Sequence, residues 1–307
     1  MYKRQVLISS IKYYFQLLKF RLSLTVVISA TAGYLIGVEN FDFIELILLA
    51  IGGFLVTGSA NGFNQILEKD YDKLMLRTMH RPLPQKKITT LNALIFSFII
   101  GVLGLYLLSM IKPHGSFYGF LSKSSAFGLL SLMIYVLSYT PLKRMSTVSI
   151  FIGAIPGAIP VLLGWVAATD DFGLAVGLLF AIQFLWQFPH FISISWIRDT
   201  EYKKAGFKMM YGEEKGRYPA AIALITSVLM TVVSVLPFFL KLNFINLSIV
   251  SFILILILGI WFTYNSYKLF KKPDDLIAKK LMLSSLVYLP FMQLIYVMDK
   301  WIIIWFL

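Results

Sequence analysis

The sequence predicts an all-α polytopic membrane protein, and three observations carry that prediction. First, 58% of the 307 residues are apolar and only 14% are charged, whereas a soluble domain has about 45–50% apolar and about 25% charged residues. Second, the chain divides into apolar stretches of about the 20 residues that a membrane-crossing helix needs. Third, the basic residues gather in alternate connections between those stretches. Ordinary soluble enzymes and disordered chains are thereby excluded.

We count nine stretches that are long and apolar enough to cross a bilayer as helices. The first follows a basic N-terminal segment and is a full span, so it is predicted to be a helix and not a cleaved signal peptide. Little chain remains outside the spans, which predicts one integral membrane domain over residues 1–307. The nine expected spans are 20–38, 43–66, 89–111, 118–139, 148–169, 173–196, 218–240, 245–268 and 281–303.

The distribution of charge predicts the orientation of the chain. Of 28 lysines and arginines, 24 fall in the N-terminal segment and in every second connection, and the other connections hold only Lys112, Lys123, Lys241 and Lys300. Basic residues are retained on the cytoplasmic side, so the N-terminus is expected inside, the C-terminus outside and the number of spans odd. The net charge of +13 is thereby attributed to topology, with no nucleic-acid partner. The absence of cysteine excludes disulfides and thiolate chemistry.

Polar residues at the end of the second span are spaced for metal binding. Asn64, Glu68 and Asp72 lie four residues apart, and each step of four turns a helical side chain by only about 40°, so the three share one face. Asp70 is expected to face elsewhere. Oxygen ligands of this kind suit Mg²⁺, which takes one or two carboxylates and completes its octahedron with water and substrate phosphate.

Two arginines follow this group of oxygen ligands. Arg77 and Arg81 are again four residues apart, and guanidinium groups bind phosphate oxygens in a bidentate manner. The joint prediction is a diphosphate held by a metal at the membrane surface. The alternative is a solvated helix end with ordinary ion pairs, but Asn61 and Gln65 also lie within the span, where polar groups are costly and usually functional.

A second polar group surrounds the end of the sixth span. It comprises Gln183, Gln187 and His190 within the span, and Asp199, Glu201 and Tyr202 just beyond it. The acidic pair would hold a second metal or the far end of the diphosphate, with a solvated helix end as an equal alternative. A lone histidine such as His190 is more often a hydrogen-bonded core residue than a ligand.

Five short motifs give the chain a family resemblance. They are NxxxExxxD at 64–72, RTMHRP at 77–82, YTPLKR at 139–144, WQFPHF at 186–191 and EYKKAG at 201–206. Together they resemble the intramembrane UbiA prenyltransferase superfamily, and within it the branch that farnesylates protoheme to haem O. Glu68 and Glu201 stand where that branch has aspartate. Phe20, between Lys19 and Arg21, replaces its usual proline.

The resemblance implies a nine-helix UbiA-type bundle in a bacterial inner membrane. It implies that farnesyl diphosphate and haem b are substrates, that Mg²⁺ bridges the diphosphate, and that haem b is not a cofactor. Haem A synthase or terminal-oxidase assembly factors are the implied partners. The implied catalytic residues are Asn64, Glu68, Asp72, Arg77 and Arg81. The implied substrate-binding residues are Lys143, Arg144, Trp186, His190, Asp199, Glu201 and Tyr202, with Asn64, Glu68, Asp72, Asp199 and Glu201 as metal ligands.

Other functions remain open at this point. One is a prenyltransferase of the same fold with another acceptor, such as a quinone precursor. Another is a secondary transporter, since broken helices and intramembrane polar residues occur there too. A haem-binding assembly protein is a third. Pro156, Gly157 and Pro160 are expected to break the fifth span, and Gly153 and Gly157 to let a bulky ligand approach the backbone.

Overall fold

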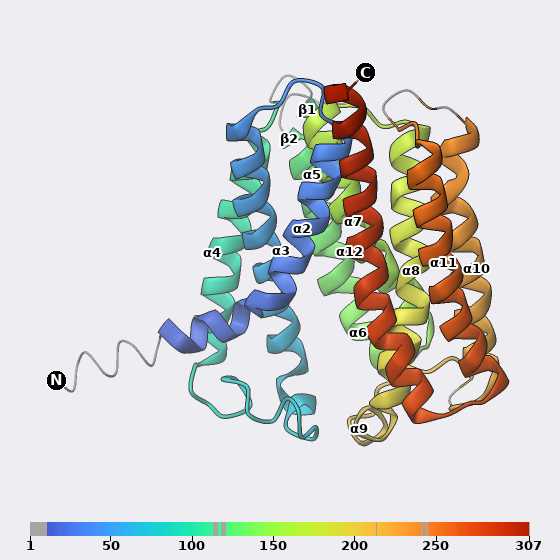
Figure 1. Ribbon diagram of the computed structural model, residues 1–307. Helices are drawn as coiled ribbons and strands as arrows, with labels where there is room; N and C mark the ends of the chain where they lie inside the picture. The colour runs from blue at the N-terminus through green and yellow to red at the C-terminus, as the bar shows by residue number, and fades with distance from the viewer. Residues whose placement is uncertain are drawn as a thin grey trace.

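The computed structural model describes residues 11–112, 116–117, 121–212, 214–240, 242 and 245–306, and it is a bundle of long helices (Figure 1). Within these residues, nine helical stretches are long and apolar enough to cross a membrane, which confirms the predicted number. They are α2 (Phe20–Gly37), α3 (Phe43–Asp72), α4 (Thr90–Ser109), the continuous stretch Lys123–Met145, α7 (Val148–Thr169), α8 (Leu174–Ile197), α10 (Arg217–Leu240), α11 (Ile249–Lys271) and α12 (Asp275–Phe306).

Two helices are longer than their apolar stretches predict. The expected second span ends at residue 66, but α3 continues to Asp72. The expected ninth span begins at residue 281, but α12 begins at Asp275. An apolar pattern ends where polar side chains begin, whereas a helix continues for as long as those side chains find partners. The extra turns of α3 carry two of the predicted metal ligands, Glu68 and Asp72, beyond the apolar stretch.

The fourth crossing is built from three consecutive segments. The helix α5 (Lys123–Met133) is followed by the π-helical turn η2 (Ile134–Tyr139) and by α6 (Thr140–Met145). Pro141 lacks a backbone N–H, and the turn before it widens so that the Thr140 N–H donates to the Tyr135 carbonyl. Single π turns of this kind are frequent at functional sites. A short hairpin of β1 (Ser116–Phe117) and β2 (Leu121–Ser122) precedes α5.

The helix α7 runs through the centre of the bundle, and it is not broken. Pro156 and Pro160 lie inside one continuous helix, so the expectation of a broken span was wrong. Neighbouring side chains bind the backbone carbonyls in this region: Gln183 Nε2 donates to the Gly157 carbonyl over 2.8 Å, and Ser131 donates to the Pro156 carbonyl. Proline is tolerated in a buried membrane helix when neighbours satisfy the backbone in this way.

The glycines of α7 make room for protein and not for a ligand. A Cβ atom at Gly153 would meet the Tyr139 ring, and one at Gly157 would overlap the Gln187 amide, so the expected ligand approach was also wrong. Gly164 serves the packing of α7 on α2, because a Cβ atom there would overlap the Ala30 carbonyl oxygen. Small residues at such crossings let membrane helices pack closely.

The connections divide between the two ends of the bundle. The α3–α4 connection, the short helix α9 (Asp199–Lys204) and the turn between α11 and α12 lie together at one end (Figure 1). The α2–α3 and α7–α8 connections lie at the other. The ends therefore alternate as the charge distribution predicts. We call them the basic end and the opposite end. Lys241, one of the four opposite-end lysines, lies outside the described residues.

Candidate active site

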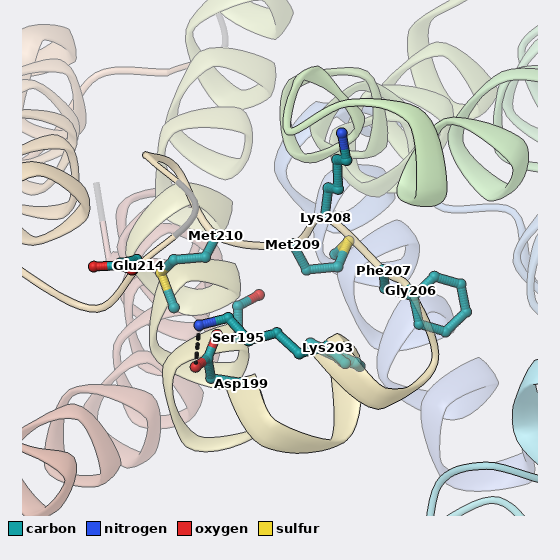
Figure 2. Close-up of a pocket in the computed structure, with 10 residues that line it drawn as sticks. Ser195, Asp199, Lys203, Gly206, Phe207, Lys208, Met209, Met210 and Glu214 are labelled. Atoms are coloured by element: carbon teal, nitrogen blue, oxygen red, sulfur yellow. Dashed lines mark ion pairs between the residues drawn. The ribbon is translucent and has the colours of Figure 1, made fainter.

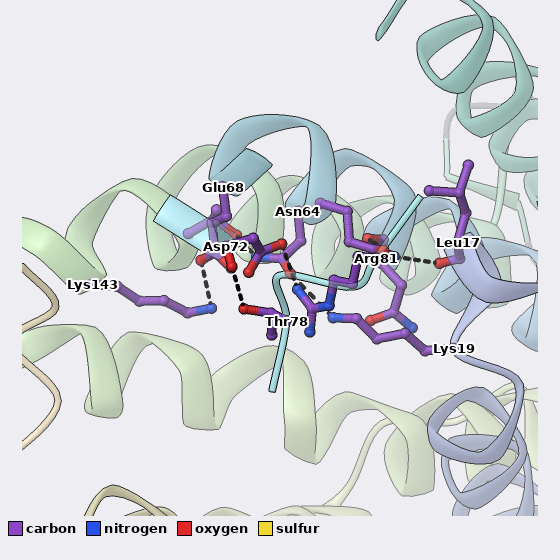
Figure 3. Close-up of polar contacts among 11 residues, drawn as sticks. Leu17, Lys19, Asn64, Glu68, Asp72, Thr78, Arg81 and Lys143 are labelled. Atoms are coloured by element: carbon purple, nitrogen blue, oxygen red, sulfur yellow. Dashed lines mark hydrogen bonds and ion pairs between the residues drawn. The ribbon is translucent and has the colours of Figure 1, made fainter. Parts of the chain in front are cut away.

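The three predicted oxygen ligands of α3 share a buried face. Asn64, Glu68 and Asp72 are 1%, 7% and 0% exposed. Asp70 points elsewhere: its side chain is 63% exposed and pairs only with Lys73 on the same helix. The spacing argument is thereby confirmed as geometry. Figure 3 shows the three side chains gathered at one place with basic residues around them.

Each of the three ligands is matched by one basic side chain from a different segment. The Lys19 ammonium, just before α2, donates to Asn64 Oδ1 over 3.1 Å. Lys143 of α6 pairs with Glu68 Oε1 at 2.9 Å. Arg81, in the α3–α4 connection, pairs with Asp72 Oδ2 at 2.7 Å. These three segments converge on α3 and together make a site rich in both carboxylates and cations.

Lys19 reaches the site through an unusual backbone conformation. Its φ of 46° is left-handed, which is uncommon for a residue with a side chain. The conformation turns the chain between helical residues 11–18 and α2, at the position where the resembled branch has Lys-Pro-Arg. Burial, with the nearby charges of Arg81 and Lys143, lowers the pKa of Lys19 to about 7. An anion bound here would favour its protonated form.

Two of the side-chain amides of α3 hold a neighbouring segment in place, and a third belongs to the candidate site. Asn61 Nδ2 donates to the Leu18 carbonyl and Gln65 Nε2 to the Leu17 carbonyl, so both hold the segment before α2 against α3. Asn64 instead turns towards the carboxylates and donates to Thr140 Oγ1. Of the three intramembrane amides in this helix, only Asn64 belongs to the predicted ligand set.

The donor set fits a magnesium ion. One oxygen of Asp72, Oδ1, is buried and has no hydrogen-bond partner, although buried carboxylate oxygens are ordinarily satisfied. Asn64 and Glu68 supply further oxygens on the same face. Within the described part of the chain, no three Asp, Glu, His or Cys side chains cluster as a metal cage. Two carboxylates and one amide are enough for Mg²⁺, which binds through one or two carboxylates and leaves the remaining positions to water and phosphate.

Of the two arginines predicted to bind phosphate, Arg81 lies in the site and Arg77 lies outside it. Arg77 is exposed, and its side chain makes no hydrogen bond or ion pair among the described residues. Arg144 lies with its guanidinium carbon 4.1 Å from the centre of the Tyr71 ring, and it donates to the Tyr71 hydroxyl. Tyr71 adjoins Asp72 in sequence, so Arg144 lies at the rim of the site.

The second acidic group is paired within its own segment. Asp199 pairs with Lys203 at 3.0 Å and Glu201 with Arg198 at 3.1 Å. Glu201 Oε2 is buried without a hydrogen-bond partner. No contact joins Asp199 or Glu201 to the carboxylates of α3 in the described chain. A second metal at these residues therefore stays a prediction.

A pocket of about 420 Å³ lies beside α9 (Figure 2). Asp199, Tyr202 and the residues from Gly206 to Met210 line it, together with Ser195, Lys203 and Glu214. Two contacts connect its wall to the carboxylate site: the Lys208 N–H donates to the Lys143 carbonyl over 2.6 Å, and Phe207 packs edge-on against Tyr71. Tyr202 packs on Phe207 in turn.

His190 and Trp186 form a stacked pair on α8 facing α12. Their ring centres are 4.6 Å apart, and Trp186 Nε1 donates to the Ser285 carbonyl. His190 Nδ1 lies 2.7 Å from Ser285 Oγ, whose proton goes to the Met282 carbonyl. With that proton on the Met282 carbonyl, Ser285 Oγ accepts from Nδ1, an arrangement that leaves the lone pair on Nε2. No described residue bonds Nε2.

Comparison with known proteins gives the family. The model of the UbiA prenyltransferase family matches residues 26–289. The chain belongs to the UbiA prenyltransferase family. Its relatives include a protein named protoheme IX farnesyltransferase from Flavobacterium psychrophilum, 41% identical over 94% of both chains. Another of the same name, from Cytophaga hutchinsonii, is 40% identical over 95% of this chain and 99% of its own. Family membership makes the protein a transferase, so the transporter alternative falls.

Solved structures of the family share the fold. One, described as digeranylgeranylglyceryl phosphate synthase in membranes, has a TM-score of 0.78 at 24% identity and covers 95% of this chain and 99% of its own. A UbiA homologue from Archaeoglobus fulgidus, described as bound to DMAPP and Mg²⁺, has a TM-score of 0.67 at 16% identity, with 93% and 99% coverage. The predicted all-helical UbiA-type fold is confirmed.

Sequence reasoning missed two site contacts. Lys19 was noted only as a basic residue beside Phe20, which departs from the family pattern, and the Tyr71–Arg144 stack was not foreseen. Both are contacts between segments far apart in the chain, 45 residues for Lys19 and Asn64 and 73 for Tyr71 and Arg144. The one available signal was the number of basic residues at the basic end.

Proposed function

We propose that this protein transfers the farnesyl group of farnesyl diphosphate to a vinyl group of haem b and forms haem O. The full-length similarity to proteins named protoheme IX farnesyltransferase supports the acceptor and the donor. The observation that carries the proposal is the buried face of Asn64, Glu68 and Asp72 surrounded by Lys19, Arg81 and Lys143. A metal-bridged diphosphate needs this combination of oxygen ligands and cations.

The reaction we propose breaks the bond between farnesyl C1 and the diphosphate oxygen. The π electrons of the haem vinyl group form the new carbon–carbon bond, and water adds to the adjacent vinyl carbon with loss of a proton. Protoheme, farnesyl diphosphate and water thus give haem O and diphosphate. When bound, Mg²⁺ would neutralise charge on the departing diphosphate, and Asn64, Glu68 and Asp72 would hold it.

The chain's own cations would stabilise the leaving group. Negative charge grows on the diphosphate as the C1–O bond breaks, and preorganised cations at that position lower the barrier most. Lys19, Arg81 and Lys143 already lie within hydrogen-bonding distance of the metal ligands. The allylic cation left behind requires a site without water, which the apolar side chains of the surrounding helices would supply.

His190 is our proposed contact to the haem. A neutral imidazole whose Nδ1 is held by Ser285 presents Nε2 as an acceptor, which is the form that ligates iron. Trp186 fixes the plane of the imidazole by stacking on it. We propose Lys143, Arg144, Asp199, Glu201 and Tyr202 as further substrate-binding residues at the basic end, with Arg77 an outer contact to phosphate.

We also propose the cellular setting. The basic end faces the cytoplasm of a bacterium, where farnesyl diphosphate is supplied, and the C-terminus lies outside. The product, a farnesylated haem, is held in the bilayer for haem A synthase or for terminal-oxidase assembly factors. The single-domain organisation over residues 1–307 stays a prediction.

Mass analysis of the haem tests the proposed reaction directly. Purified protein is incubated with haem b, farnesyl diphosphate and Mg²⁺, and the extracted haem is analysed by liquid chromatography and mass spectrometry. We expect a product heavier by one farnesyl group plus one hydroxyl group, absent when EDTA is added and strongly reduced with Asp72→Asn. If the haem stays unmodified while a quinone precursor is prenylated under the same conditions, the quinone precursor replaces haem as the proposed acceptor.

A further inference from the structure

The proposed metal ligands already have cationic partners. Glu68 pairs with Lys143 at 2.9 Å and Asp72 with Arg81 at 2.7 Å. All four side chains are largely buried, with exposed fractions of 9%, 12%, 0% and 18% in that order. A buried ion pair is costly to break unless each partner gains a new one, because an unpaired buried charge is strongly unfavourable.

This pairing opposes the binding of either ligand alone. A divalent metal that approaches Glu68 and Asp72 must displace Lys143 and Arg81 and leave their positive charges beside its own. A diphosphate that draws away Lys143 and Arg81 leaves the two carboxylates unpaired beside an anion. When both bind, each displaced group finds a partner: the carboxylates take the metal and the cations take phosphate oxygens.

We infer that Lys143 and Arg81 are exchangeable counter-ions that occupy the metal ligands until metal and diphosphate arrive together. This inference rests on the proposed metal–diphosphate site. It assigns the two residues a second role, as inhibitors of metal binding in the empty enzyme, and it makes the affinity for each ligand depend on the presence of the other. Such coupling is reciprocal by thermodynamic necessity.

The structure allows the exchange without moving the backbone. The Lys143 carbonyl is fixed by the Lys208 N–H at 2.6 Å, while its ammonium lies 4.4 Å from the centre of the Tyr139 ring. The lysine stem has four rotatable bonds, so the ammonium can leave Glu68 while the ring still contacts it. The free oxygen Oδ1 of Asp72 offers a first contact for the metal before Arg81 is displaced.

The test measures each ligand in the absence of the other. Binding of Mn²⁺ without diphosphate is followed by electron paramagnetic resonance, and binding of inorganic diphosphate in EDTA is followed by calorimetry. For Lys143→Gln we expect Mn²⁺ to bind about tenfold more tightly and diphosphate about tenfold more weakly, within the usual range of coupling between sites. Arg81→Gln should change both affinities in the same directions.

The opposite signs distinguish the inference from a structural role, because a variant that merely disturbs the fold weakens both ligands. Lys73→Gln is the matched control: it removes a lysine, the residue after the end of α3, from an exposed ion pair with Asp70, and we expect both affinities to stay unchanged. Equal weakening, or no change, in both Lys143→Gln and Arg81→Gln would overturn the exchange alone. Wild-type protein that binds neither probe even when Mn²⁺ and diphosphate are supplied together would overturn the proposed site itself, and the exchange with it.

Discussion

At the residue scale, the direction in which a polar side chain of α3 points decides whether the residue belongs to the site or to the packing and surface of the helix. Asp70 and Asp72 are two residues apart on α3, yet one is exposed and the other fully buried. Asn61 and Asn64 differ in the same way, since one holds a backbone carbonyl and the other joins the carboxylates. The helical period thus turns a short polar stretch into one face for the site and another for solvent and packing.

Substitution of the carboxylates measures this division. We expect Asp72→Asn and Glu68→Gln each to lower turnover by about a hundredfold or more, the scale of losing one preorganised electrostatic group. Haem binding should stay near normal. Asp70→Asn should retain nearly full turnover, because its side chain pairs only with Lys73. Steady-state kinetics with farnesyl diphosphate and haem b measure the turnover of the three variants. Equal losses in all three would contradict the role of the shared face.

His190 gives a second prediction at this scale. In His190→Ala we expect a shifted Soret band and weaker haem binding, with the affinity for farnesyl diphosphate unchanged, because Nε2 is lost while the carboxylate site is intact. His80→Ala is the control, since His80 is exposed in the α3–α4 connection. An unchanged haem spectrum in folded His190→Ala would leave the histidine only its hydrogen bond to Ser285 on α12.

At the element scale, the backbone groups at several helix ends form hydrogen bonds with side chains from distant segments. At the opposite end of the bundle, Lys300 of α12 donates to the Ile36 and Val38 carbonyls at the end of α2. Lys112 and Lys123 donate to the Ala168 and Asp170 carbonyls at the end of α7. Positive charge at a helix C-terminus is favourable, which gives these three opposite-end lysines a structural reason to be there.

Asp299, next to Lys300, accepts hydrogen bonds at the N-terminal end of α11, whereas the lysines donate at the C-terminal ends of α2 and α7. It accepts from the Ser248 N–H, the Ser248 hydroxyl and the Ser251 hydroxyl at the start of that helix. A carboxylate at a helix N-terminus complements the dipole in the same way. Two neighbouring residues of α12 therefore hold the ends of two different helices.

The crossing of α2 and α7 gives the prediction at the element scale. In Gly164→Ala the new methyl group would overlap the Ala30 carbonyl, and we expect a loss of about 1–3 kcal/mol, as for other overpacked sites. Gly177→Ala on α8 has open space around the new methyl group, so we expect equal or slightly higher stability. Thermal unfolding of both variants in detergent measures the difference, and matching midpoints would contradict close packing at Gly164.

At the scale of the whole molecule, the two ends of the bundle differ in charge and in length of connection. The long basic connections and α9 lie at the end where the carboxylate site is formed (Figure 1). The diphosphate of the proposed donor is charged and water-soluble, whereas its farnesyl tail and the proposed haem acceptor are apolar. A site at the basic end of the bundle would suit both, because its polar part would meet water and its apolar part would enter the bundle.

Cysteine labelling tests the orientation. The native chain has no cysteine, so single cysteines can be introduced on a clean background at the exposed residues Lys86 and Asp171. Lys86 belongs to the α3–α4 connection and Asp171 to the α7–α8 connection, and these connections lie at opposite ends of the bundle. With a membrane-impermeant maleimide added to intact cells, we expect Asp171→Cys to be labelled and Lys86→Cys to react only after lysis. Labelling of both from the same side would contradict the nine-span topology.

The sequence by itself determined the class of fold, the number of spans and the shared face of Asn64, Glu68 and Asp72. These depend on composition and on the helical period, which are local properties. Only the tertiary structure decided that α7 stays continuous through Pro156 and Pro160, that its glycines accommodate Tyr139 and Gln187, and that Lys19, Arg81 and Lys143 pair with the three ligands. Each depends on side chains from segments distant in the chain. No local pattern encodes which carbonyl or carboxylate a distant side chain will meet.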